Sequence, residues 1–171
     1  MADDAAAQSG SPAAAAAREP VAAMMRILGY PLALDRCYEP ATHMWVLRAG
    51  EGVARIGMDP LGIETSGTLA QLSFQPVGTT LTAGRPFGQL EAAKFVGPLV
   101  SPVNGILQAV NDAVISDPGL AERDPFGPGW LIEVSLSDAT VPGSLLSEPD
   151  DITAWFVGKV EEYQLKGVLA Q

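Results

Sequence analysis

The chain has 171 residues and a formal net charge of −10, from 20 acidic and 10 basic side chains. This length fits one domain, and an acidic chain with scattered arginines is not typical of a nucleic-acid-binding protein. Its one cysteine, Cys37, excludes an intrachain disulfide, and together with the one histidine, His43, it leaves no zinc-type ligand set. Because the chain has so few candidate catalytic side chains, we do not expect it to be an enzyme.

Residues 1–25 are rich in alanine and are expected to form a disordered tail. The tail begins with acidic residues and is broken by glycine and proline, which is unlike a signal peptide. No apolar run approaches the ~20 residues that a bilayer-spanning helix needs. We therefore expect a cytoplasmic protein without membrane contact. Residues 22–30 are expected to form a helical turn or the lead into the domain.

Residues 26–140 are expected to form one domain, because short apolar segments alternate there with glycine, proline and asparagine turns. The predicted strands cover residues 44–47, 53–57, 69–74, 80–81, 87–92, 95–100, 105–110 and 130–134. This pattern predicts a mainly β fold, a flattened antiparallel barrel or sandwich with short peripheral helices.

Three helices are expected outside these strands. Two short ones are predicted over residues 59–65 and 111–121, with Asn111 as a helix cap. Residues 141–171 are predicted to be a linker followed by a helix over residues 150–168, with Asp151 or Thr153 at its start.

Lys94 is one of only three lysines and the only one before residue 159. It lies between two predicted strands in the segment "QLEAAKFVGP", residues 89–98. On either side, residues 77–91 and 101–112 each combine a glycine turn with an apolar strand. Two similar hairpins placed head to head would put Lys94 at an exposed tip, where a modifying enzyme can reach it. An ordinary solvated lysine is the alternative interpretation.

Five segments, in order, resemble motifs of the glycine cleavage H-protein family. They are "HMWV" (43–46), "GVARIGM" (52–58), "VGTTLTAGRPFGQLEAAK" (77–94), "SPVNGILQAVNDAV" (101–114) and "DPGLAERDPFGPGWLIEV" (117–134). The resemblance implies a lipoyl-carrier domain of the barrel-sandwich hybrid type. It also implies that Lys94 carries lipoate in amide linkage.

The same resemblance implies a non-catalytic, monomeric carrier whose arm visits several enzymes in turn. A lipoate ligase or lipoyltransferase would attach the arm. Glycine decarboxylase, aminomethyltransferase and dihydrolipoamide dehydrogenase would then use it. Tethering keeps the carried group at a high effective concentration.

Two departures from the family pattern leave alternatives open. The segment Glu91-Ala92-Ala93-Lys94 lacks the serine that the family has between its glutamate and its lysine. The residues that follow, "FVGP" (95–98), look more like the H-like lipoate-binding proteins of sulfur oxidation, which serve heterodisulfide-reductase-like complexes. A second alternative is an H-like scaffold or binding module without the modification.

Three further residues are candidates for ligase or partner recognition, or for a pocket that shelters the arm: Glu91, Phe95 and His43. Glu91 could equally be a solvated strand carboxylate. For His43 the favoured interpretation is instead that it caps a strand or lies on the surface. Trp45 is expected in the core.

Overall fold

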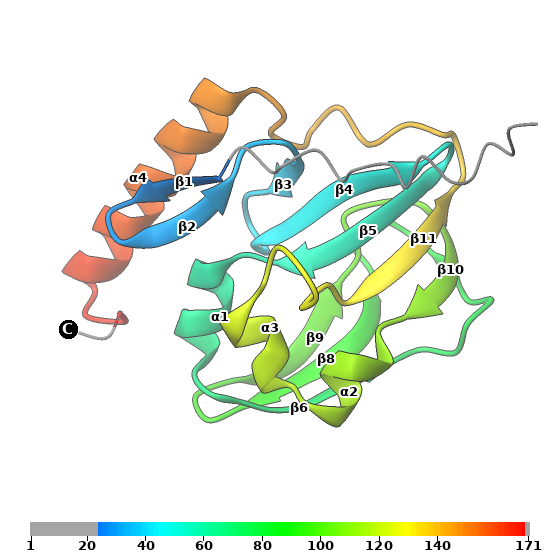
Figure 1. Cartoon of the computed structure of the whole chain (residues 1–171), viewed down its shortest axis with the longest axis horizontal. Helices are drawn as coiled ribbons and strands as arrows, with labels where there is room; N and C mark the ends of the chain where they lie inside the picture. Colours follow the sequence, from blue (N-terminus) through cyan, green and yellow to red (C-terminus); the bar gives the residue numbers. More distant parts are fainter. Residues whose placement is uncertain (1–23, 170–171) are drawn as a thin grey trace, which may run out of the picture.

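The computed structural model describes residues 24–169 (Figure 1). Its strands are β1 (Met24–Ile27), β2 (Tyr30–Ala33), β3 (Cys37–Glu39), β4 (Met44–Gly50), β5 (Val53–Met58), β6 (Leu69–Phe74), β7 (Thr80–Leu81), β8 (Pro86–Ala92), β9 (Val96–Val100), β10 (Gly105–Val110) and β11 (Ile132–Leu136). Its helices are α1 (Pro60–Ser66), α2 (Asp112–Ser116), α3 (Gly119–Arg123) and α4 (Pro149–Leu165).

Two antiparallel sheets build the domain, as the alternation of apolar residues predicts. One has the strand order β3-β4-β5-β11-β10-β7 and the other has the order β6-β8-β9. The two sheets share one core, in which Ile56, Leu107 and Val134 from the larger sheet cluster with Leu90 and Leu99 from the smaller. The short helices α1, α2 and α3 lie at the edge of these sheets (Figure 1). The predicted mainly β fold with peripheral helices is confirmed.

The predicted boundaries are confirmed for β6, β7 and β10, and they differ by one to three residues elsewhere. The described part of the segment 22–30, residues 24–30, does not form a helical turn. Residues 24–27 instead form β1, which pairs with β2 in a hairpin that turns at Leu28 and Gly29, both at positive φ. The predicted tail, residues 1–25, lies outside the described residues except for Met24 and Met25, which belong to β1.

The single helix predicted over residues 111–121 is instead two helices, α2 and α3. The break falls at Asp117, which precedes Pro118, because a residue before proline disfavours the helical conformation. The predicted cap is confirmed, since the Asn111 side chain accepts the N–H of Ala113. The first helix begins at Pro60, one residue later than predicted, and Asp59 is its N-cap.

Helix α4 begins after Glu148, and neither Asp151 nor Thr153 is its cap. It buries Ile152, Phe156 and Val160, which recur every four residues along one face. This face packs with Ile27 and Leu32 of the β1–β2 hairpin in a second apolar cluster (Figure 1). The N-terminal hairpin and the C-terminal helix therefore form one layer on the outside of the larger sheet.

Gly57 supplies a test of this packing, because its missing side chain makes room for the fully buried indole of Trp45. A Cβ at this position would lie 2.3 Å from Trp45 Cζ2. We expect Gly57→Ala to lower the free energy of unfolding by about 1–3 kcal/mol, since the core has no space for the extra carbon. Urea denaturation measures the change.

Gly158→Ala is the matched control, since a Cβ there, in α4, meets nothing within 4 Å. Replacing a helical glycine by alanine should raise stability by up to ~1 kcal/mol. Equal stability of Gly57→Ala and the unchanged protein would contradict the contact with Trp45.

Candidate functional site

Lys94 lies in the turn that joins β8 to β9, as the sequence predicts. The turn is fastened by its backbone to the C-terminal end of α1. The N–H of Lys94 donates to the carbonyl of Ser66 over 3.0 Å, and the N–H of Ala93 donates to the carbonyl of Thr68 over 2.9 Å. The base of the Lys94 side chain is therefore fixed, while the side chain itself is exposed.

Gly67 allows the turn to approach α1 this closely. It caps the helix with φ 87° and ψ −172°, a conformation essentially restricted to glycine. A Cβ at Gly67 would lie 3.1 Å from both the Cγ and the backbone nitrogen of Lys94. The position of Lys94 thus depends on a glycine that is 27 residues earlier in the chain.

The Lys94 ammonium differs from those of the other two lysines. Lys159 and Lys166 both pair with Glu162, over 2.9 and 2.6 Å respectively. Within residues 24–169, no side chain forms an ion pair with Lys94. An exposed amine without a competing carboxylate, on a rigid tip, suits acylation by a partner enzyme. The residues present therefore fit an amide-linked lipoyl group.

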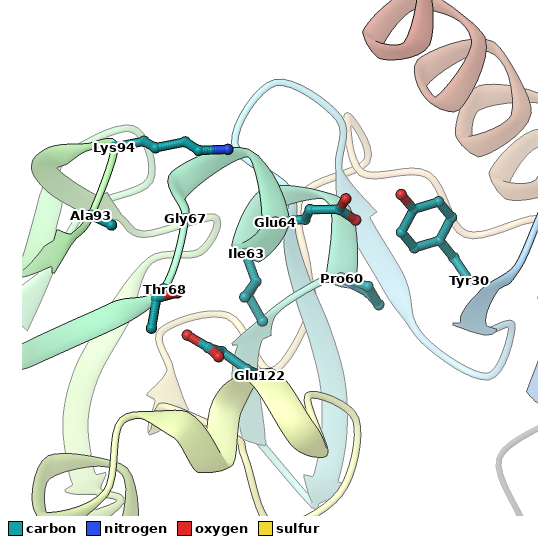
Figure 2. A pocket seen from close by; sticks show the side chains of 9 residues that line it. All are labelled: Tyr30, Pro60, Ile63, Glu64, Gly67, Thr68, Ala93, Lys94 and Glu122. Atoms are coloured by element: carbon teal, nitrogen blue, oxygen red, sulfur yellow. The ribbon is translucent and has the colours of Figure 1, made fainter. Parts of the chain in front are cut away.

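A hollow of about 440 Å³ lies beside Lys94, and we call it the Lys94 hollow (Figure 2). Two carboxylates line it, and both have partners. Glu64 faces the hydroxyl of Tyr30, and burial together with the nearby Glu64 carboxylate raises the pKa of Tyr30 to about 12. Glu122 accepts the backbone N–H of Leu69.

A second cavity, of about 330 Å³, is also bordered by α1, and we call it the Tyr163 cavity. It is lined by residues from α1, α4, the two sheets and the loop before β4. The lining includes Thr42, His43, Met44, Met58, Phe95 and Tyr163. Phe95 directly follows Lys94, so the cavity begins next to the tip.

His43 forms part of the wall of the Tyr163 cavity and is only 6% exposed. Its Nδ1 lies 2.8 Å from Asp59 Oδ2, and its Nε2 lies 2.8 Å from the hydroxyl of Tyr163. Asp59 also accepts the N–H of Gly62 over 2.9 Å, so one carboxylate caps α1 and orients the imidazole. The expected placement of His43 on the surface is wrong, because these buried partners hold it inside.

The structure brings two of the three predicted accessory residues together. Phe95 is 46% exposed and lies at the Tyr163 cavity with His43. Glu91 is exposed on β8, paired with Val96 across the hairpin, and it lines neither hollow. Their roles in recognition or shelter stay predictions.

Tyr163 is the residue of this site that sequence reasoning missed. It lies seven positions after the buried Phe156, a spacing that returns to the same face of a helix. That spacing was the available signal. Burial raises the pKa of the Tyr163 hydroxyl.

Two other kinds of feature were sought among the described residues, a metal-binding cluster and a membrane-spanning helix. Between residues 24 and 169, no three histidine, cysteine or carboxylate side chains gather in a way that could hold a metal ion. In the same part of the chain, no helix combines the length and apolar character required to cross a membrane.

Comparisons with a family model, with known sequences and with a solved structure all lead to the same protein family. Residues 37–156 match the sequence model of the family described as glycine cleavage H-protein. The glycine cleavage system H protein of Mycobacterium avium is 36% identical over 115 residues, which cover 67% of this chain and 87% of that protein. The corresponding protein of Thermobifida fusca is 39% identical over 111 residues, which cover 65% of this chain and 85% of that one.

A solved structure agrees with these sequence matches. The crystal structure of a glycine cleavage system H protein from Mycobacterium marinum superposes with a TM-score of 0.63 at 30% identity. The superposition covers 72% of this chain and 97% of that chain. The family match is confined to residues 37–156, so it includes neither the β1–β2 hairpin nor Tyr163. Since the matched segment spans well over half of the sequence, the chain belongs to the glycine cleavage H-protein family.

Proposed function

We propose that this chain is a lipoyl carrier protein in which lipoate is joined in amide linkage to Nζ of Lys94. The observation that carries the proposal is an exposed lysine, unpaired within residues 24–169, on a tip whose backbone is fastened to α1. A rigid base with a free amine lets a ligase reach the lysine and lets the finished arm swing. The chain has no catalytic activity of its own in this proposal.

The residues of the β8–β9 turn have distinct roles in the proposed carrier. The carbonyls of Ser66 and Thr68 hold the turn, so that the arm starts from a constant point. Amide formation removes the positive charge of Lys94. The exposed side chains of Glu91 and Phe95 lie within three residues of Lys94, where a lipoate ligase or lipoyltransferase would recognise its target.

The bound lipoyl disulfide would supply the chemistry: it would open on receiving an aminomethyl group, pass that group on, and then close again by giving up two electrons and two protons to a dehydrogenase. The names of the relatives, glycine cleavage system H protein, favour three partners: glycine decarboxylase, aminomethyltransferase and dihydrolipoamide dehydrogenase. The net charge of −10 would steer the carrier toward basic docking surfaces. We place this monomeric carrier in the cytoplasm, where a lone cysteine stays reduced.

A second candidate function is supported by the residues after Lys94. Phe95 is 46% exposed and Val96 is 60% exposed, so the tip presents apolar surface to a partner. The segment "FVGP" (95–98) resembles lipoate-binding proteins that carry sulfur for heterodisulfide-reductase-like complexes.

The two carrier functions differ in what loads the arm. Incubation of the lipoylated protein with glycine decarboxylase and glycine is expected to add the mass of glycine less carbon dioxide, which is one aminomethyl group on one sulfur and one hydrogen on the other. Failure to load, combined with mass gain from a heterodisulfide-reductase-like complex and a sulfane-sulfur donor, would favour the second candidate.

Lys94→Arg tests the carrier proposal itself. Protein purified from its own cells should have the mass of the chain plus one lipoyl group, and the Lys94→Arg variant should lack that increment, because arginine offers no acylable amine. Intact-protein mass spectrometry measures both. Lys159→Arg is the control, since Lys159 is tied to Glu162 and should leave the increment in place.

An unmodified mass that persists after co-expression with a lipoate ligase and free lipoate would contradict the carrier proposal. The chain would then be an H-like scaffold or binding module.

Gly67→Ala tests whether the anchored tip matters to the modifying enzyme. A Cβ would strain a φ of 87° and press on Lys94, at a cost of about 1–3 kcal/mol in stability. We expect lipoylation in vitro to slow by about tenfold or more, because a displaced lysine fits the ligase poorly. The rate is followed by mass spectrometry.

Gly78→Ala is the matched control for backbone strain. Gly78 has a φ of 94°, but a Cβ there meets nothing within 4 Å. It should lose stability while keeping the lipoylation rate of the unchanged protein. Equal lipoylation rates for both variants would show that the approach at Gly67 is unimportant.

A further inference from the structure

Tyr163 lies near an end of α4 that is fixed on both sides. Val160, before it, is fully buried, and Leu169, after it, is nearly so, and both belong to the apolar cluster of α4 and the β1–β2 hairpin. The N–H of Val168 donates back to the carbonyl of Tyr163 over 3.1 Å. Gly167, at φ 66°, lets the chain turn back there, as is common where helices end. The Tyr163 hydroxyl therefore has a fixed position.

The hydroxyl of Tyr163 orients the ring of His43. A carboxylate can only accept, so the Nδ1 atom that faces Asp59 Oδ2 carries a proton. In the neutral ring Nε2 is then an acceptor, and the Tyr163 hydroxyl, 2.8 Å away, donates to it. Without this hydroxyl, the buried Nε2 would lose the partner that the structure gives it, which is costly.

His43 in turn holds Asp59 by two bonds. The carbonyl of His43 accepts the N–H of Asp59 over 2.9 Å, and the imidazole is bonded to the carboxylate. His43 has a φ of 60°, which is uncommon for a residue with a side chain and persists where neighbouring contacts enforce it. Gly62 of α1 lies directly against it, since a Cβ there would be 2.6 Å from the Cβ of His43. The orientation of His43 therefore affects the start of α1.

Helix α1 connects this start to the Lys94 turn. Asp59 caps its N-terminus, and its seven residues span about 10 Å. A helix this short is not stable by itself, so its place depends on the contacts at its ends. At the other end, the carbonyl of Ser66 accepts the N–H of Lys94 over 3.0 Å. A series of hydrogen bonds and one short helix thus joins the Tyr163 hydroxyl to the backbone of Lys94.

We propose that Tyr163 is a positioning residue for the acylation of Lys94, acting through His43, Asp59 and α1. This inference rests on the proposed lipoylation of Lys94. The hydroxyl restricts the motion of the turn from which the amine projects, and a turn held in one place presents the amine to the ligase in one geometry. Tyr163 lies after residue 156, where the family match ends, so the C-terminal part of this chain takes part in placing the lysine.

The first experiment observes the His43 ring directly. His43 is the only histidine of the chain, so ¹⁵N-labelled histidine gives the nitrogen signals of this ring alone. In unmodified protein, in mildly alkaline buffer, Nδ1 should appear as a protonated nitrogen and Nε2 as an acceptor. Tyr163→Phe removes only the hydroxyl and should move both signals toward the averaged values of exchanging tautomers. An unchanged ring spectrum would overturn the proposal.

Tyr38→Phe is the matched control. Tyr38 belongs to the same apolar cluster, but its hydroxyl donates to the carbonyl of Ala33 over 2.5 Å. This variant should lose stability and leave the His43 signals in place. Signals that move equally in both variants would contradict the role of the Tyr163 hydroxyl.

The second experiment follows amide hydrogen exchange in unmodified protein. The amides of Gly62 and Lys94 belong to the connection, and the amide of Leu107 reports on the core between the two sheets. Tyr163→Phe should speed exchange at Gly62 and Lys94 by about fivefold more than at Leu107, as expected for one lost hydrogen bond. Tyr38→Phe should affect all three amides alike. Equal acceleration at the three amides in Tyr163→Phe would show that no connection exists.

The third experiment measures lipoylation of the unmodified protein by a lipoate ligase. Tyr163→Phe should lower kcat by about threefold or more and leave KM within about twofold, because the amine is placed less uniformly while the recognised surface is unchanged. Tyr38→Phe should keep the kcat of the unchanged protein.

A rise in KM at constant kcat would mean that the ligase contacts Tyr163 itself, and would overturn the positioning role. Equal kcat values for Tyr163→Phe and Tyr38→Phe would overturn it as well. These outcomes differ from failure of the carrier proposal, in which the unchanged protein accepts no lipoyl group at all.

Discussion

The buried carboxylate of Asp59 is the constraint on which the site depends. A carboxylate that is fully removed from water must be paired and hydrogen-bonded, and Asp59 meets this need with the N–H of Gly62 and with His43. The hydrogen bond from the N–H of Gly62 to Asp59 caps the N-terminus of α1. Because α1 ends where the β8–β9 turn is fastened, the same carboxylate determines where Lys94 stands relative to both sheets.

The hydrogen bond between Asp59 and His43 connects this region to the C-terminal helix α4. The other ring nitrogen of His43 is hydrogen-bonded to the hydroxyl of Tyr163. Two hydrogen bonds of 2.8 Å therefore join the loop before β4 to the start of α1 and to the end of α4. The remaining part of α4 is held by its apolar face against the β1–β2 hairpin. Segments outside the family match thus reach the neighbourhood of the proposed lipoyl lysine without altering the two-sheet barrel.

The two hollows near Lys94 differ in the charge of their linings. The Lys94 hollow has Glu64 and Glu122 in its lining, whereas the lining of the Tyr163 cavity has no carboxylate in the described residues. The family fold accounts for an exposed lysine on a rigid tip, and the C-terminal half of α4, beyond the family match, adds Tyr163 to the lining of the cavity beside it.

The sequence by itself determined the elements whose signals are local. Alternating apolar residues between glycine and proline turns predicted the boundaries of β6, β7 and β10 and the turn that holds Lys94. The preference of asparagine for helix N-termini predicted the cap at Asn111. The run "MMRI" has no alternation, so β1 became evident only through its pairing with β2 and its packing on α4. The tertiary structure alone decided the surroundings of His43. Its partners are 16 and 120 residues away in the chain, and a pattern confined to neighbouring residues contains no information on such contacts.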